Sequence, residues 1–298
     1  MNSSEMIVGQ NGDTKLRDLQ LKSLEILLYF ADFCGKYDLK FFLCGGSCIG
    51  TIRHGGFIPW DDDIDVFMPR KDYEKLEDLW MEYANTEKYS YCRTNKDINY
   101  KLAVATIRDN ETTFIRDYQM NLDINHGVRM DIIPLDGCPE NRVKRYIQLG
   151  WGFVFHLFNR EAMASSSQKL LGKIGAATLK IIRSKNARYK IWRFAEKQMS
   201  KYPIDDENIN YITELCVPYR YMKNEYPKEL FEKAVYKEFE GYTMPLPIGY
   251  DKYLRMAFGD YMELPPEEDR APKHVAFYIN VNEPYEKYEG IYYFADDK

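Results

Sequence analysis

Apolar positions along the first third of the chain change between helical and strand-like spacing. Over residues 14–37 they recur at helical spacing with Lys and Glu between them, which predicts an amphipathic helix. Residues 39–44 are a short apolar run stopped by two glycines, and such a run predicts a buried strand. We expect a short helix to start directly afterwards, with Ser47 as its N-cap.

A second strand and a longer helix follow these elements. Residues 64–68 form a strand-like run, and the apolar positions of residues 72–83 fall on one helical face. Further strands are predicted over residues 101–108, 112–116 and 128–133. This mixture of helices and strands favours an α/β or α+β catalytic core over residues 14–137.

The composition changes after this core. Residues 138–202 are predicted to form a helical basic insertion, and residues 203–298, where Pro and Tyr are frequent, form a third segment. Residues 162–195 contain no acidic residue and eight basic ones, namely Lys169, Lys173, Lys180, Arg183, Lys185, Arg188, Lys190 and Arg193. A solvated helical face is one interpretation of this pattern. A surface that meets anionic lipid or a phosphate-bearing acceptor is the other.

Charge and cysteine content narrow the function classes. A net charge of −5 argues against a protein that coats nucleic acid. The sequence shows no apolar run of about 18 residues, so no membrane-spanning helix is expected, and its first residues do not resemble a secretory signal. The six cysteines lack paired CxxC spacing, which favours reduced thiols in a cytoplasmic enzyme over a zinc site or disulfides.

The chemistry is carried by an aspartate cluster, in which four carboxylates fall within residues 61–65. Two carboxylates about 4 Å apart repel by roughly 4 kcal/mol at an effective dielectric near 20, so the cluster calls for a cation. In an extended strand Asp61, Asp63 and Asp65 would project from the same face. Oxygen ligands with no His or Cys nearby in the sequence favour Mg²⁺ or Mn²⁺ over zinc.

A glycine-rich turn before the cluster supplies the second half of the expected site. Gly45 and Gly46 let the backbone approach a ligand closely. A helix that starts at Ser47 would point free N–H groups at a phosphate, and Arg53 can pair with phosphate oxygens. The turn and the aspartates together predict a site for a metal ion and a nucleotide's phosphates.

The order strand, Gly-Gly-Ser, short helix and Asp-x-Asp resembles the nucleotidyltransferase superfamily. The longer run from Gly45 to Val66, with Ile-Pro-Trp-Asp-Asp-Asp-Ile-Asp-Val at its end, resembles the LicD family, which contains bacterial phosphocholine transferases and is related to fukutin and fukutin-related protein. The resemblance spans residues 14–137 and 215–275. It implies an α+β fold with a mixed sheet flanked by helices, which residues 203–298 complete.

The resemblance also implies an activity and roles for individual residues. The activity is transfer of an alcohol phosphate, phosphocholine first, from a CDP-linked donor to a hydroxyl of a cell-surface glycan or its lipid-linked precursor. Asp61, Asp63, Asp65 and Asp131 are expected to hold the metal, and Asp131 is also a candidate to accept the acceptor's proton. Weaker candidates for substrate contacts are Lys101, Arg108, Arg129, Arg270 and His274.

Two other functions use the same residues. A nucleotidyltransferase would move a nucleoside monophosphate from a triphosphate to a small acceptor and release pyrophosphate. A non-catalytic module would bind a nucleotide or glycan on the same scaffold, although all the candidate carboxylates are present. With the preferred function, we expect a cytoplasmic protein whose segment 162–195 contacts the inner face of the membrane.

Overall fold

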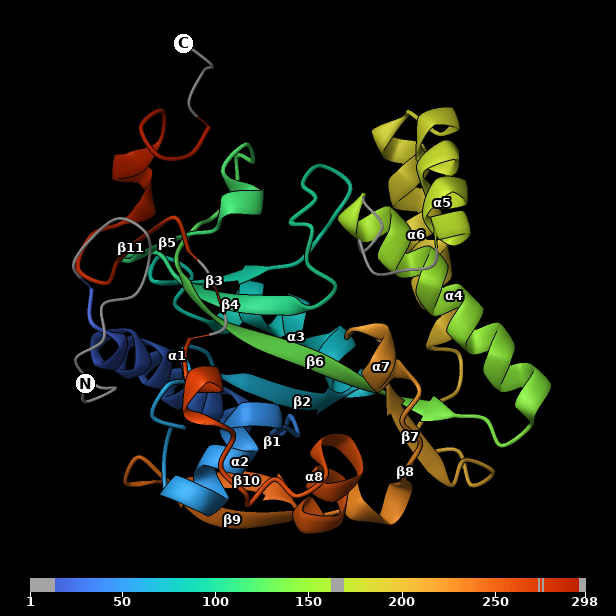
Figure 1. Ribbon diagram of the computed structural model, residues 1–298, viewed down its shortest axis with the longest axis horizontal. Helices are drawn as coiled ribbons and strands as arrows, with labels where there is room; N and C mark the ends of the chain where they lie inside the picture. Colours follow the sequence, from blue (N-terminus) through green and yellow to red (C-terminus); the bar gives the residue numbers. More distant parts are fainter. Residues whose placement is uncertain (1–13, 162–168, 273, 275, 295–298) are drawn as a thin grey trace. The chain divides into compact units, whose positions relative to one another are not determined.

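The computed structural model describes residues 14–161, 169–272, 274 and 276–294, but not the side chains of residues 169–174 (Figure 1). The described chain has an α+β fold, as expected. It divides into two compact units. Residues 14–92, 106–132 and 229–294 form the first unit, and residues 93–105 and 133–228 form the second. From the sequence we expected domain limits after residues 137 and 202. The division into two compact units does not test these limits, which stay a prediction.

The first unit is built on a mixed sheet that carries the aspartates. Its helices are α1 (Leu16–Lys36), α2 (Gly45–His54), α3 (Arg70–Tyr83) and α8 (Tyr250–Phe258). Its strands are β1 (Phe42–Leu43), β2 (Asp65–Pro69), β3 (Tyr89–Cys92), β4 (Ala105–Asp109), β5 (Thr113–Ile115), β9 (Ala234–Phe239), β10 (Tyr242–Pro247) and β11 (Tyr278–Asn280), and β6 (Val128–Cys138) starts here. The main sheet has the order β1-β2-β6-β4-β3, while β9 pairs with β10 and β5 with β11. Strands β2 and β6 are therefore neighbours, as Figure 1 shows.

The second unit is dominated by helices. They are α4 (Arg142–Arg160), α5 (Lys169–Ile181), α6 (Lys185–Met199) and the short α7 (Tyr219–Met222). Strands β7 (Tyr211–Glu214) and β8 (Tyr226–Pro227) extend the second half of β6. The core lies between α4 and α6, where the rings of Phe155 and Trp192 stack with centroids 5.4 Å apart. None of the described helices is both long enough and apolar enough to cross a bilayer.

The long helices match the sequence prediction because each has one continuous buried face. Helix α1 covers almost the whole predicted range 14–37. Helix α3 starts two residues earlier than predicted and buries Tyr73, Leu76 and Trp80. Apolar residues at helical spacing bring these side chains to one side, where burial stabilises each by roughly 1.5–3 kcal/mol.

Three predicted strand limits are wrong. The strand expected over residues 39–44 is reduced to Phe42–Leu43, because the Leu39 N–H donates to Cys34 O and the Lys40 N–H to the Asp72 carboxylate instead of to a strand. The strand expected from residue 101 begins only at Ala105. Strand β6 continues five residues past the predicted limit because its end pairs with β7.

Two predictions at the aspartate cluster also need correction. Ser47 does not cap α2: the helix starts at Gly45, and the Ser47 hydroxyl accepts the Asp65 N–H at 3.1 Å. Asp61 and Asp63 do not lie on a strand, which begins at Asp65. The chain makes a turn through Pro59, closed by a 2.9 Å hydrogen bond from Asp61 N to Ile58 O, and a turn cannot continue a strand ladder.

Candidate active site

The predicted metal ligands come from two neighbouring strands and the turn before them. Asp65 is the first residue of β2, and Asp131 lies on β6. The Asp131 N–H donates to Ile64 O at 3.0 Å, so the backbone at Asp131 lies directly beside the residue before Asp65. Asp61 and Asp63 lead into β2. The sheet therefore brings together residues about 70 positions apart in the sequence.

The glycine pair lies against these carboxylates. A methyl group on Gly46 would be 2.2 Å from Asp61 Oδ2, and one on Gly45 would be 3.8 Å from Asp65 Oδ2. Gly45 also has a φ of +53°, which side chains rarely adopt. The glycine pair therefore lies against the aspartate cluster, while the close approach to a ligand expected at Gly45–Gly46 stays a prediction. The Gly45 N–H itself donates to the Tyr253 hydroxyl at 3.0 Å.

Burial and neighbouring charges raise the pKa of two of these carboxylates. Burial raises the pKa of Asp65 well above its usual value, and the charges of Asp63, Asp131 and Asp61 raise it further. Burial also raises the pKa of Asp63, where His274 opposes the shift and Asp62 and Asp131 add to it. Each carboxylate thus feels the negative charge of its neighbours. A cation between them would relieve this repulsion.

His274 pairs with two residues of the cluster. Its Nδ1 is 3.0 Å from Asp62 Oδ1 and 3.2 Å from Asp63 Oδ2, and its backbone N–H donates to Asp62 Oδ2 at 3.2 Å. Burial disfavours the imidazolium, but the Asp62 hydrogen bond and the Asp63 charge outweigh it and raise the pKa of His274. The expectation that no histidine lies near the cluster holds only along the sequence. In space, Asp62, Asp63 and His274 form a group with metal-ligand spacing within the described residues.

Two arginines and a tyrosine also lie near the cluster. Arg129 places Nε 2.8 Å from Asp131 Oδ1 and donates from Nη2 to Asp131 Oδ2 at 3.2 Å. Arg116 is 8% exposed, and its charge acts on both Asp63 and Asp131. The charges of both guanidinium groups also act on Tyr118. Burial would raise the pKa of Tyr118, but the two arginines lower it. This cationic group balances part of the aspartate charge.

Arg53 and Arg270 form a second cationic pair beside Asp61. Burial and the Arg270 charge lower the pKa of Arg53, and the Asp61 charge opposes that shift. Arg53 Nη1 donates to Tyr261 O at 2.8 Å, which ties α2 to the chain after α8. The Arg270 guanidinium lies over the Trp60 ring, 5.6 Å from its centroid. Arg53 and Arg270 thus present two positive charges near one edge of the carboxylate group.

The other two candidates for substrate contacts are Arg108 and Lys101. Arg108 on β4 is 1% exposed, and its guanidinium donates to Thr106 Oγ1 at 3.1 Å and to Asn125 O, which are structural contacts. Lys101 belongs to the second unit and lies at a bend before β4, with a φ of +55°.

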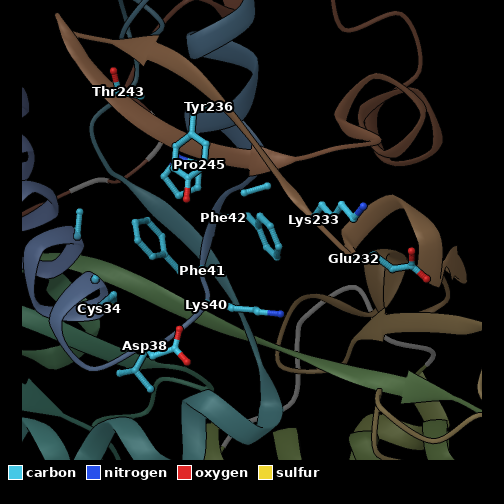
Figure 2. A pocket seen from close by; sticks show the side chains of 14 residues that line it. Cys34, Asp38, Lys40, Phe41, Phe42, Glu232, Lys233, Tyr236, Thr243 and Pro245 are labelled. Atoms are coloured by element: carbon cyan, nitrogen blue, oxygen red, sulfur yellow. The ribbon is translucent and has the colours of Figure 1, made fainter.

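A separate pocket of about 600 Å³ opens in the first unit between the end of α1, strand β1 and the β9–β10 hairpin (Figure 2). Its lining carries both signs of charge, from Asp38 and Glu232 and from Lys40 and Lys233, around the ring of Phe41. None of the predicted site residues lines it. The pocket and the aspartate cluster are therefore different places in the fold.

Two similarities to known proteins indicate the family of this chain. A family described as "LicD/FKTN/FKRP, nucleotidyltransferase domain" matches residues 38–136, which contain the glycine pair and all the predicted metal ligands. A Haemophilus influenzae protein named "Lipopolysaccharide cholinephosphotransferase LicD" is 34% identical over 271 residues, covering 87% of this chain and 96% of the relative. This chain belongs to the LicD family. It is a LicD-type phosphotransferase with a nucleotidyltransferase-like core.

Sequence reasoning missed three residues of this LicD-family site. Asp62 was treated as part of the cluster without a role, yet it is 4% exposed and holds His274. Arg116 and Tyr118 were not considered at all. No local pattern marks the role of Asp62, because its partner His274 lies 212 positions away in the sequence. No local pattern marks Arg116 or Tyr118, because they reach the cluster from the loop after β5.

Proposed function

We propose that this protein transfers phosphocholine from CDP-choline to a hydroxyl of a cell-surface glycan, or of its lipid-linked precursor, with Mg²⁺ or Mn²⁺ as cofactor. The observation that carries the proposal is the cluster of mutually repelling carboxylates packed on a glycine pair. The name of the H. influenzae relative, which matches over 96% of its length, supports phosphocholine as the group and lipopolysaccharide as an acceptor.

The reaction is a substitution at the phosphorus that bears choline. The acceptor oxygen forms a new bond to that phosphorus, the phosphoanhydride bond breaks, and CMP leaves with the bridging oxygen and its electron pair. The acceptor proton goes to a base, for which Asp131 is our candidate. Phosphoryl transfer of this kind depends mainly on positioning and charge neutralisation.

The aspartates fit a divalent metal. Asp61, Asp63, Asp65 and Asp131 offer carboxylate oxygens, the ligands that Mg²⁺ and Mn²⁺ prefer, and their mutual repulsion is what a cation would remove. When bound, such an ion neutralises phosphate oxygens and orients the donor. His274 holds Asp62 and Asp63 in place through hydrogen bonds.

The cationic residues are assigned to the donor phosphates. Arg53 and Arg270 lie together near Asp61, where two phosphates carried to the cluster would meet them. Gly45, Gly46 and Ser47 let the start of α2 approach the same phosphates. Arg129, paired with Asp131, is assigned to the transferred phosphate.

We also propose that the enzyme works in the cytoplasm at the inner face of the membrane. In the predicted basic segment 162–195, residues 162–168 and the side chains of Lys169 and Lys173 lie outside the described residues. Lys180, Arg183, Lys185 and Lys190 are exposed, as a surface that meets anionic lipid requires.

The test is an assay with several possible donors, in which the released product identifies the reaction. Purified protein and Mg²⁺ are given CDP-choline, CDP-ethanolamine, CDP-glycerol, CDP-ribitol, CTP or ATP, with and without lipopolysaccharide. We expect CMP release and choline incorporation from CDP-choline alone, both lost with EDTA. Pyrophosphate from CTP or ATP would identify a nucleotidyltransferase instead.

Aspartate variants connect the activity to the cluster. Asp63→Asn and Asp65→Asn remove a negative charge at nearly constant volume, so the fold should survive while turnover falls by at least about 10³-fold. Asp78→Asn on the exposed side of α3 is the matched control and should keep full activity. Full turnover by both cluster variants would refute the proposed site.

A further inference from the structure

Helix α4 of the second unit has two apolar faces. The inner one packs against α6 through buried residues that include Leu149, Phe155 and Phe158. The outer one is in solvent: Val143 is 68% exposed, Tyr146 72%, Ile147 49% and Phe153 43%. At 100° per residue these four positions fall within one third of the helix circumference, opposite the inner face. A stripe of this kind on a soluble surface usually marks an interaction site.

Aromatic rings extend the stripe on both sides. Phe153 packs on Tyr219 at the start of α7 with centroids 4.6 Å apart, and Tyr219 is 46% exposed. On the other side Trp151 meets Phe194 of α6 at 5.3 Å, and Phe194 is 52% exposed. Lys223 lies over the Tyr219 ring at 5.0 Å. Exposed aromatic rings beside lysines are typical of surfaces that lie in a lipid headgroup region.

The charge of the helices around the stripe is mainly positive, although Glu225 pairs with Arg142 at 3.3 Å and with Arg145 at 3.2 Å. Residues 142–197 hold thirteen Lys and Arg against two Glu, a net charge of +11 in a chain whose total is −5. Both glutamates are engaged internally, Glu161 with Arg188 at 2.9 Å and Glu196 with Arg93 at 2.6 Å. What remains at the surface of these helices is positive. Basic residues near an anionic bilayer are attracted to its lipid headgroups.

We infer that the outer face of α4, with Tyr219 and Phe194, is a docking surface for an anionic lipid bilayer. The apolar stripe enters the headgroup region, and Lys144 and the exposed basic residues of α5 and α6 meet the lipid phosphates. A second copy of the chain is a poorer occupant, because two such positive surfaces repel each other.

This surface differs from the segment 162–195 that the sequence indicated, because its apolar part lies mostly on α4 and α7, and only Phe194 belongs to that segment. The inference gives the proposed enzyme access to a lipid-linked acceptor, but vesicle binding is measured without catalysis. The donor assay and the vesicle assay can therefore fail independently.

The experiment is co-sedimentation with vesicles of phosphatidylcholine alone or with 30% phosphatidylglycerol. We expect the wild-type protein to bind the anionic vesicles only, and to be released by salt. The triple variant Val143→Ser, Ile147→Ser, Phe153→Ser should bind at least about tenfold more weakly. Met81→Ser, which removes an equally exposed apolar side chain from α3, should bind like the wild type.

A second variant separates charge from apolar contact. Lys144→Gln, Lys180→Gln and Lys185→Gln together should weaken binding and reduce its salt dependence, while thermal unfolding and turnover of soluble substrates stay unchanged. Wild-type binding by the Ser variant would overturn the inference. So would a concentration-dependent dimer, seen by analytical ultracentrifugation, that the Ser variant abolishes, because the stripe would then be covered by protein.

Discussion

At Gly46, we expect an added methyl group to reduce activity without preventing folding. That methyl would lie 2.2 Å from Asp61 Oδ2, so the carboxylate, the mobile end of a side chain, must move. The backbone of Gly46 has a negative φ and lies in a helix, where Ala is as good as Gly or better. We therefore expect Gly46→Ala to lower turnover about 10²-fold while the free energy of unfolding changes by less than about 1 kcal/mol.

Two other glycines serve as controls for this prediction. Gly35 in α1 has nothing within 4 Å of an added methyl, so Gly35→Ala should leave turnover unchanged. Gly50 faces the backbone oxygen of Gly56 at 2.3 Å, so Gly50→Ala should lower the melting temperature instead. Denaturant unfolding and CMP release are measured on all three variants, which separates a loss of turnover from a loss of stability. A fully active Gly46→Ala enzyme would mean that Asp61 is not held against the glycine for function.

At the same scale, the sequence predicted that the carboxylates interact but not the geometry in which they do so. Asp61, Asp63 and Asp65 were expected on one face of a strand, and their charges do act on one another, although only Asp65 lies on a strand. The partnership of Asp62 with His274 spans 212 positions, so no local pattern could show it. Metal-site roles remain a prediction for all of them.

Among the elements, the helices were predictable and the short strands were not. A helix such as α3 repeats its apolar face over four turns, so periodicity finds it. Strand β3, with only four residues and no regular alternation, was not predicted. Its position depends on pairing with β4, which is a property of the whole sheet.

Strand β7 contains a buried acid whose titration should be visible in stability. Glu214 accepts a 2.5 Å hydrogen bond from the Tyr226 hydroxyl of β8. Burial raises its pKa to about 7 against the pull of that bond. The folded state therefore holds the Glu214 proton more tightly than the unfolded chain, where the value is 4.5. The resulting stabilisation is full below pH 4.5 and is lost as the pH rises towards 7.

The prediction is tested by comparing the wild type with Glu214→Gln, which keeps the hydrogen bond but cannot ionise. The wild type should lose on the order of 3 kcal/mol relative to this variant between pH 4.5 and 7, measured by urea unfolding. Glu238→Gln, at an exposed position on β9, should show no such pH-dependent difference. A difference between wild type and Glu214→Gln that does not vary with pH would show that Glu214 is not titrating in this range.

At the scale of the whole molecule, the total charge follows from the sequence, but the distribution of basic and apolar residues over the surface does not. The net charge of −5 argues against a nucleic-acid-coating protein, and this remains a prediction. Composition also located the basic stretch. It could not show that the helix before that stretch, α4, turns apolar residues outward, because an amphipathic pattern does not say which face is covered.

The six cysteines give a prediction that concerns the whole fold. All six are buried and none forms a disulfide bond, and they lie in both units, at positions 34, 44, 48, 92, 138 and 216. Burial raises the pKa of Cys138 to about 11 and that of Cys34 well above its usual value, so almost no thiolate exists near neutral pH. We expect no rapid reaction with an aromatic disulfide reagent at pH 8, and six equivalents after unfolding in guanidinium. The variant Met81→Cys, at an exposed site, should react at once with a single equivalent. A fast thiol in the native wild type would mean that one unit opens locally, and tryptic mapping of the labelled cysteine would name that unit.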